Sequence, residues 1–82
     1  MNVTIKLIGR YKDLVGQDTL IVPLQDEGTI WQILNILGKQ YPQIDKDKKF
    51  IIVAKNNIYT NKEQPVADGD EITITPPVVS GG

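Results

Sequence analysis

The stretch that decides the fold is 29-TIWQILNILGKQYP-42, which has the pattern of one amphipathic helix. Its apolar residues recur at helical spacing and form a single stripe on one face: Ile30, Ile33, Leu34, Leu37 and Tyr41. Thr29 and Gln32 have the spacing of a capping box, which predicts that the helix begins here. Pro42 predicts its end, because the residue before a proline disfavours helical backbone. The apolar stripe is expected to pack against one apolar surface elsewhere in the chain.

Short alternating segments on both sides of the helix predict a sheet that supplies this surface. Their ranges are 2–8, 19–24, 50–55, 58–59 and 71–75. Pro23 has no N–H to donate to a neighbouring strand, so the second segment is expected at an edge of the sheet.

The segments between these elements are expected to be loops and turns. Residues 10–16 are predicted to form a connector that ends at Gly16, and residues 43–49 a polar loop. Asn56-Asn57 and Asp68-Gly69 are typical of tight turns.

The order of the elements predicts one topology. With a hairpin first and the helix crossing to the third strand, the last strand most easily pairs with the first, parallel to it. This is the β-grasp, or ubiquitin-like, fold. We therefore expect an α+β domain at residues 1–76, with a mixed sheet of four to five strands packed on one main helix. An extended, flexible diglycine tail, residues 77–82, is expected to follow.

The composition argues against catalysis by this chain alone. The 82 residues include no cysteine and no histidine, which removes the thiol nucleophile, the commonest general base and the commonest transition-metal ligand. Three acidic residues, Asp68, Asp70 and Glu71, surround Gly69, and we interpret them as parts of a turn and not as a metal site. No metal is therefore expected.

Charge and hydropathy also limit the classes of partner that this chain can bind. Nine basic and ten acidic residues give a net charge of −1, without the basic stripe that nucleic-acid binding needs. No apolar run approaches the length of a membrane span, and the first residues lack the pattern of a signal peptide. We expect a cytoplasmic protein that binds neither nucleic acid nor membrane.

Isoleucines at two outward strand positions predict an apolar patch on the face of the sheet away from the helix. Ile8 and Ile21 occupy these positions, and one alternating half of residues 50–54 must join them. Such a patch on a small protein often marks a partner site. The alternative is that loops cover this face.

The last residues, 76-PPVVSGG-82, form an ordered series. Prolines keep a chain extended, and glycines have no Cβ and pass through narrow slots. The segment expected to insert into a partner is Pro76, Pro77, Val78, Val79, Ser80 and Gly81. The unhindered carboxylate of Gly82 is a candidate for conversion to an acyl-adenylate by an ATP-binding partner. The alternative is an inert, flexible terminus.

Three segments resemble motifs of the small sulfur-carrier family (MoaD/ThiS type), and within it the small subunit of molybdopterin synthase. They are 8-IGRYKDLVG-16, 65-PVADGDEI-72 and 76-PPVVSGG-82. The family forms are Phe-Ala-x-x-Arg-Glu-x-x-Gly, Pro-Leu-x-Asp-Gly-Asp-Glu-Val and Pro-Pro-Val-Ser-Gly-Gly. The double proline before the diglycine is the most specific of these features.

The resemblance implies that this chain is a sulfur carrier and not a catalyst by itself. A ubiquitin-activating-type enzyme would adenylate Gly82, which would then become a thiocarboxylate. Inserted into the large subunit of molybdopterin synthase, it would deliver sulfur to the pterin precursor. ATP and Mg²⁺ would belong to the activating enzyme, with no cofactor on this chain. The implied docking face includes Ile8, Ile21 and Thr75.

Other functions remain open beside this one. A thiamin-type (ThiS-type) sulfur carrier or a ubiquitin-like protein modifier would use the same activated Gly82, and a passive binding module would not use it. The chain also departs from the resembled family, with Ile8-Gly9 for Phe-Ala, Thr75 for Phe, and one extra valine in the tail. An extra residue adds about 3.3 Å of reach, so the partners are expected to differ accordingly.

Overall fold

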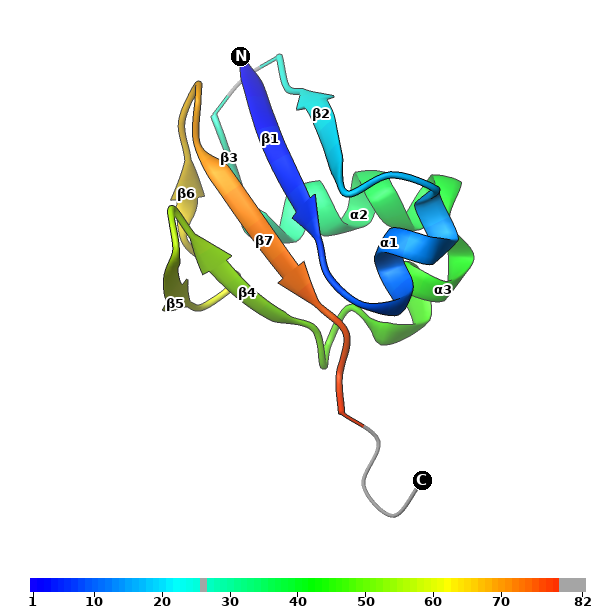
Figure 1. The fold of residues 1–82 in the computed structure, drawn as a ribbon. Helices are drawn as coiled ribbons and strands as arrows, with labels where there is room; N and C mark the ends of the chain where they lie inside the picture. Colours follow the sequence, from blue (N-terminus) through cyan, green and yellow to red (C-terminus); the bar gives the residue numbers. More distant parts are fainter. Residues whose placement is uncertain (26, 79–82) are drawn as a thin grey trace.

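The computed structural model describes residues 1–25 and 27–78, which form a mixed sheet covered on one face by a helix (Figure 1). The five-stranded sheet contains β1 (Asn2–Leu7), β2 (Thr19–Pro23), β4 (Ile52–Lys55), β5 (Ile58–Thr60) and β7 (Glu71–Thr75). A separate two-stranded pairing joins β3 (Gly28–Thr29) and β6 (Pro65–Val66). The helices are α1 (Arg10–Val15), α2 (Ile30–Gln40) and α3 (Pro42–Asp47).

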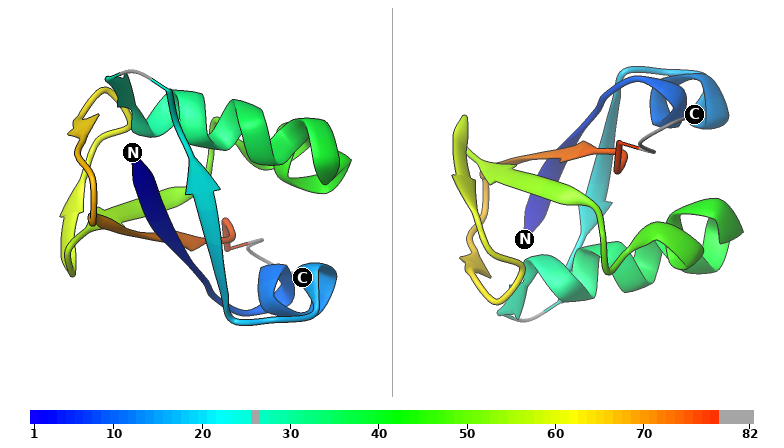
Figure 2. Two further views of the ribbon diagram at one scale, coloured as in Figure 1. Left: turned by 90° about the horizontal axis from the view of Figure 1, so that it is seen from above. Right: turned by 90° about the horizontal axis from the view of Figure 1, so that it is seen from below.

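The strand order of the large sheet is β2-β1-β7-β4-β5. β1 and β7 run parallel at its centre, with Ile5 opposite Ile72, and the other neighbours are antiparallel. The predicted pairing of the last strand with the first is therefore confirmed. The edge position of β2, inferred from Pro23, is confirmed as well. This topology is the β-grasp, and Figure 2 shows α2 crossing one face of the sheet.

The core lies between α2 and the inner face of the sheet. Alternate residues of β1 and β7 point toward α2 and are 0–1% exposed: Val3, Ile5, Leu7, Ile72 and Ile74. The helix meets them with the predicted residues Ile30, Ile33, Leu34 and Leu37, all buried. Burial of each such side chain stabilises the fold by roughly 1.5–3 kcal/mol before entropy costs. The predicted amphipathic helix is thus confirmed.

Both predicted ends of α2 are also confirmed. Thr29 is the N-cap, and its backbone N–H donates to Oε1 of Gln32 at 2.9 Å. At the other end, Tyr41 has extended backbone, with φ −124° and ψ 92°. Pro42 follows it and imposes this conformation. Tyr41 therefore lies just beyond α2 and is half-buried, while the other members of the stripe are fully buried.

Two predicted loops are wrong, because each overlaps a helix of six residues. The connector at 10–16 contains α1, and residues 43–49 overlap α3. Helices this short are marginal without tertiary contacts, and each here buries one large side chain, Tyr11 in α1 and Ile44 in α3. Gly16, with φ 85°, ends α1 as the predicted punctuation residue.

The predicted tight turns are confirmed by left-handed backbone. Asn56 and Asn57 have φ of 51° and 70° between β4 and β5, and Gly69 has φ 85° before β7. Asp70 accepts hydrogen bonds from the Ala67 N–H at 2.8 Å and from Asn56 Nδ2 at 3.1 Å. The bond from Ala67 is the main reason why the pKa of Asp70 is lowered. The Asp70 carboxylate therefore stabilises the turn.

Across residues 1–25 and 27–78, no helix has both the length and the apolar character needed to span a bilayer.

Candidate functional site

The chain leaves the sheet directly from the end of β7. Pro76 and Pro77 are half-buried, and Val78 is 87% exposed. Figure 1 shows this segment pointing away from the end of the sheet. The remaining predicted site residues, Val79, Ser80, Gly81 and Gly82, lie outside the described residues. We call residues 75–77 the tail root.

Gly9 provides the turn that brings α1 beside the tail root. It has φ 59° and ψ −131°, a conformation that side chains other than glycine rarely adopt. A Cβ at this position would lie 3.5 Å from Cγ of Pro76, so the two residues are in close contact. The alanine of the resembled family would be strained in this backbone. The departure at Ile8-Gly9 therefore places a glycine where this backbone favours one.

A shallow depression on the outer face of the sheet begins at the tail root. Its lining residues come from β1 and the residue that follows it, from β7 and from the β4–β5 hairpin: Lys6, Ile8, Ala54, Asn57, Tyr59, Thr73 and Thr75. Two of the three predicted docking residues, Ile8 and Thr75, are thus brought together. We call this feature the outer-face depression.

The third predicted docking residue, Ile21, lies apart from the depression. It is on the edge strand β2, opposite Thr4, and does not contribute to the lining. It is nevertheless 60% exposed, and Ile52, opposite Thr75, is 46% exposed. The described residues therefore do not cover this face, and the alternative that loops bury the apolar patch is wrong for them.

Two large exposed residues with apolar side-chain surface were missed as individual site residues. Tyr59 is 79% exposed and lies opposite Ala54 on the outer face. Phe50, 69% exposed, immediately precedes Ile51 and β4. The alternation in residues 50–54 was a usable signal for Phe50. Tyr59 gave none, because only its pairing with β4 determines the face to which it points.

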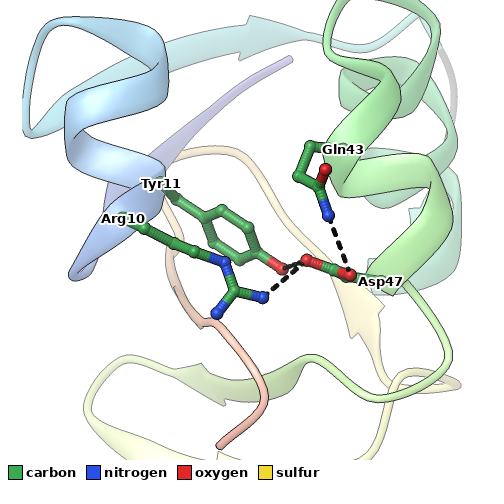
Figure 3. Close-up of polar contacts among 4 residues, drawn as sticks. All are labelled: Arg10, Tyr11, Gln43 and Asp47. Carbon is green, nitrogen blue, oxygen red and sulfur yellow. Dashed lines mark hydrogen bonds and ion pairs between the residues drawn. The ribbon is translucent and has the colours of Figure 1, made fainter. Parts of the chain in front are cut away.

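A polar interlock joins α1 to α3 near the tail root (Figure 3). The hydroxyl of the buried Tyr11 donates to Oδ2 of Asp47 at 2.7 Å, and Arg10 Nη2 donates to the same oxygen at 2.9 Å. Gln43 Nε2 donates to Oδ1 of Asp47 at 3.3 Å. All four residues fall within segments that the sequence analysis expected to be loops.

The interlock shifts the pKa values of two groups in opposite directions. Burial, aided by the hydrogen bond to Asp47, raises the pKa of the Tyr11 hydroxyl well above its ordinary value. Burial alone would also raise the pKa of Asp47. The hydrogen bonds from Tyr11, Arg10 and Gln43 outweigh it and hold that pKa below its usual range. At neutral pH the interlock is an ionised carboxylate held by three donors, which suits a structural role.

The residues at and next to the tail root form a largely apolar surface. Ile8, Thr75 and the prolines cannot donate or remove protons at neutral pH.

A protein-family model described as the ThiS family matches residues 5–82. The chain therefore belongs to the ThiS family, and the resemblance to the small sulfur carriers is confirmed. The chain is 35% identical over 81 residues to the protein named "Molybdopterin synthase sulfur carrier subunit" of Dictyostelium discoideum. This alignment covers 95% of the chain and 93% of the relative.

Solved structures agree with the β-grasp assignment. The crystal structure of small archaeal modifier protein 1 of Haloferax volcanii superposes with a TM-score of 0.80 at 26% identity, covering 100% of both chains. A chain of the complex of subunits 1 and 2 of molybdopterin-converting factor from Helicobacter pylori superposes with a TM-score of 0.63. At 21% identity, covering 99% of this chain and 100% of that one, the second match speaks for the fold alone.

Proposed function

We propose that this chain is the sulfur-carrier subunit of a molybdopterin synthase. The observation that carries the proposal is the 35% identity, along 95% of the chain, to a protein with that name. The fold supports it, since the central strand β7 leads straight into the tail. In this function the chain supplies an acyl group, and its partners supply the catalytic side chains.

The reacting group is the carboxylate of Gly82. In the active site of a ubiquitin-activating-type enzyme it attacks the α-phosphorus of ATP, which forms the acyl-adenylate and releases pyrophosphate. A sulfur donor then displaces AMP and leaves a thiocarboxylate. ATP and Mg²⁺ are bound by the activating enzyme. The absence of Cβ atoms on Gly81 and Gly82 supports this route, because the tail then passes through two different channels without steric conflict.

The thiocarboxylate is consumed in the large subunit of molybdopterin synthase. There it transfers sulfur to the pterin precursor, and the carboxylate is regenerated by hydrolysis. Both partners dock on the outer face, on the side that carries Ile8, Ile21 and Thr75. A shared surface means that the partners bind in succession, so the carrier shuttles between them. The cycle uses cellular ATP, and we place it in the cytoplasm.

The test compares the wild type with a variant that lacks Gly82. Each protein is incubated with the activating enzyme, ATP, Mg²⁺ and a sulfur donor. Its intact mass is then measured, and the large subunit is added for a pterin-conversion assay. The wild type is expected to gain the mass of one oxygen-to-sulfur exchange and to support conversion. The truncated variant is expected to do neither, with thermal unfolding unchanged within about 0.5 kcal/mol.

Lys39→Gln, an exposed change on α2, is the control and is expected to behave as the wild type. Conversion by the truncated variant, or no sulfur uptake by the wild type, would overturn the proposal.

A second candidate, a ubiquitin-like protein modifier, is favoured by the match to small archaeal modifier protein 1 along the whole of both chains. It predicts a ladder of lysine conjugates in cells that disappears with Gly82. The thiamin-type alternative is supported by the family description alone. Failure of pterin conversion by a carrier that does take up sulfur would favour it.

A further inference from the structure

We infer that Lys6 is a recognition residue that pairs with a carboxylate on the large subunit when the outer face is docked. This inference rests on the proposed function and adds the chemistry of the partner surface. Lys6 is on β1, opposite Thr19 of β2 and Thr73 of β7. Its side chain points to the outer face and lines the outer-face depression.

The charge of Lys6 lies within a neutral surface. The other residues that line the depression are Ile8, Ala54, Asn57, Tyr59, Thr73 and Thr75, none of which is charged at neutral pH. Lys6 is exposed in the free protein, so water solvates its ammonium there. The depression therefore combines an apolar and aromatic lining with one positive charge.

No carboxylate in the described part of the chain neutralises this charge. The ion pairs found there join Arg10 to Asp47 and Lys48 to Asp45. Glu71 is an acidic residue on the same face, but it lies opposite Thr4 and not opposite Lys6. Lys55, by contrast, is engaged within the fold, since it donates to the carbonyl of Pro65 at 3.1 Å.

Docking changes the surroundings of this ammonium. A partner that covers the depression removes water from Lys6, and a desolvated charge without a counter-charge strongly opposes binding. The long aliphatic stem of lysine packs readily on apolar surface while its head group meets a polar one. The fitting partner surface is therefore apolar and carries an Asp or Glu side chain opposite Lys6.

The position of Lys6 links this contact to the chemistry. Its neighbour Thr73 is two residues before Thr75, where the tail root begins. A carboxylate that fixes Lys6 therefore also fixes the point from which the tail extends. We assign it to the large subunit, the partner that must hold the carrier during sulfur transfer.

The test measures the dissociation constants of the complexes with the large subunit and with the activating enzyme by isothermal titration calorimetry. Lys6→Met removes the charge and retains much of the stem, and Lys6→Glu reverses the charge. For the large subunit, we expect the dissociation constant to rise about tenfold for Lys6→Met and about a hundredfold for Lys6→Glu. The control Lys39→Met, an exposed lysine on α2, is expected to change it less than about twofold. Thermal unfolding should be unchanged in all three variants, because both lysines are exposed.

The outcomes separate this inference from the proposed function. If Lys6→Met binds the large subunit as tightly as the wild type or more tightly, the inference is overturned and the proposed function is left intact. A loss confined to the activating enzyme would overturn the assignment to the large subunit. If the wild type neither binds the large subunit nor transfers sulfur, the proposed function fails, and the inference fails with it.

Discussion

The two faces of the sheet are built from the same strands but have opposite uses. On β1, Ile5 is fully buried against α2, while its neighbour Lys6 is exposed on the outer face. On β7, Ile72 is buried and Thr73 lines the outer-face depression. Because successive side chains of a strand alternate between faces, a shift of one position separates a residue for stability from a residue for recognition.

The strongest test of this contrast is Ile72→Ala on the inner face. It removes a fully buried side chain at the centre of the sheet and is expected to lower the free energy of unfolding by about 2–5 kcal/mol. Urea denaturation followed by the fluorescence of Trp31 measures the change. Thr73→Ala, one position along on the outer face, is the matched control, with an expected loss below about 1 kcal/mol. Equal losses would show that the faces are not divided in this way.

The second test places a charge on the outer face. Ile8→Lys is expected to weaken both partner complexes at least tenfold, about 1.4 kcal/mol, because an unpaired ammonium replaces an apolar side chain in the depression. The free energy of unfolding is expected to change by less than about 1 kcal/mol. Calorimetric titration with each partner measures the effect.

Ile36→Lys is the control for this substitution. Ile36 is 40% exposed, whereas Ile8 is half-buried, and Ile36 lies on α2, in the layer that covers the inner face. Its replacement should leave both affinities unchanged. If Ile36→Lys weakens the complexes as much as Ile8→Lys, docking does not use the outer face.

The third test concerns the interlock, which belongs to neither face and whose effect on stability is expected to depend on pH. The lowered pKa of Asp47 means that its carboxylate stabilises the fold above the unfolded pKa of about 3.9. This contribution is lost as the pH falls through the lower folded value. Asp47→Asn is therefore expected to cost about 1–2 kcal/mol at pH 7, and the deficit should shrink below about pH 4.

Urea denaturation of both proteins between pH 7 and pH 3 measures this dependence. Asp13→Asn, which changes an exposed carboxylate on α1, serves as the control and should give little effect. A deficit for Asp47→Asn that is constant with pH would mean that lost packing, and not the charge, is responsible.

The helices illustrate what was predictable and what was not. The stripe of α2, its cap at Thr29 and its stop at Pro42 follow from local spacing alone, and the structure confirms each. α1 and α3 are shorter than two helical turns, so periodicity gives little signal for them. A proline in the first turn, Pro42, was available as a start signal for α3, but it was interpreted only as the end of α2.

The candidate site also has features that were predictable from the sequence and features that were not. The outward direction of Ile8 was predicted from alternation within one strand. Its distance from Ile21 was not, because that depends on the register and order of separate strands. The interlock around Asp47 joins residues more than thirty positions apart, and no local pattern predicts such a contact.

The sequence by itself determined the α2 stripe, the alternating strands, the tight turns and the tail motif, because each depends on neighbouring residues and their backbone preferences. The tertiary structure alone decided that Lys6, Ile8, Tyr59 and Thr75 share one depression beside the tail root. It also decided that α1 and α3 are held together by Asp47. These features arise from pairing and packing between distant segments, whose geometry is fixed only when the whole core is formed.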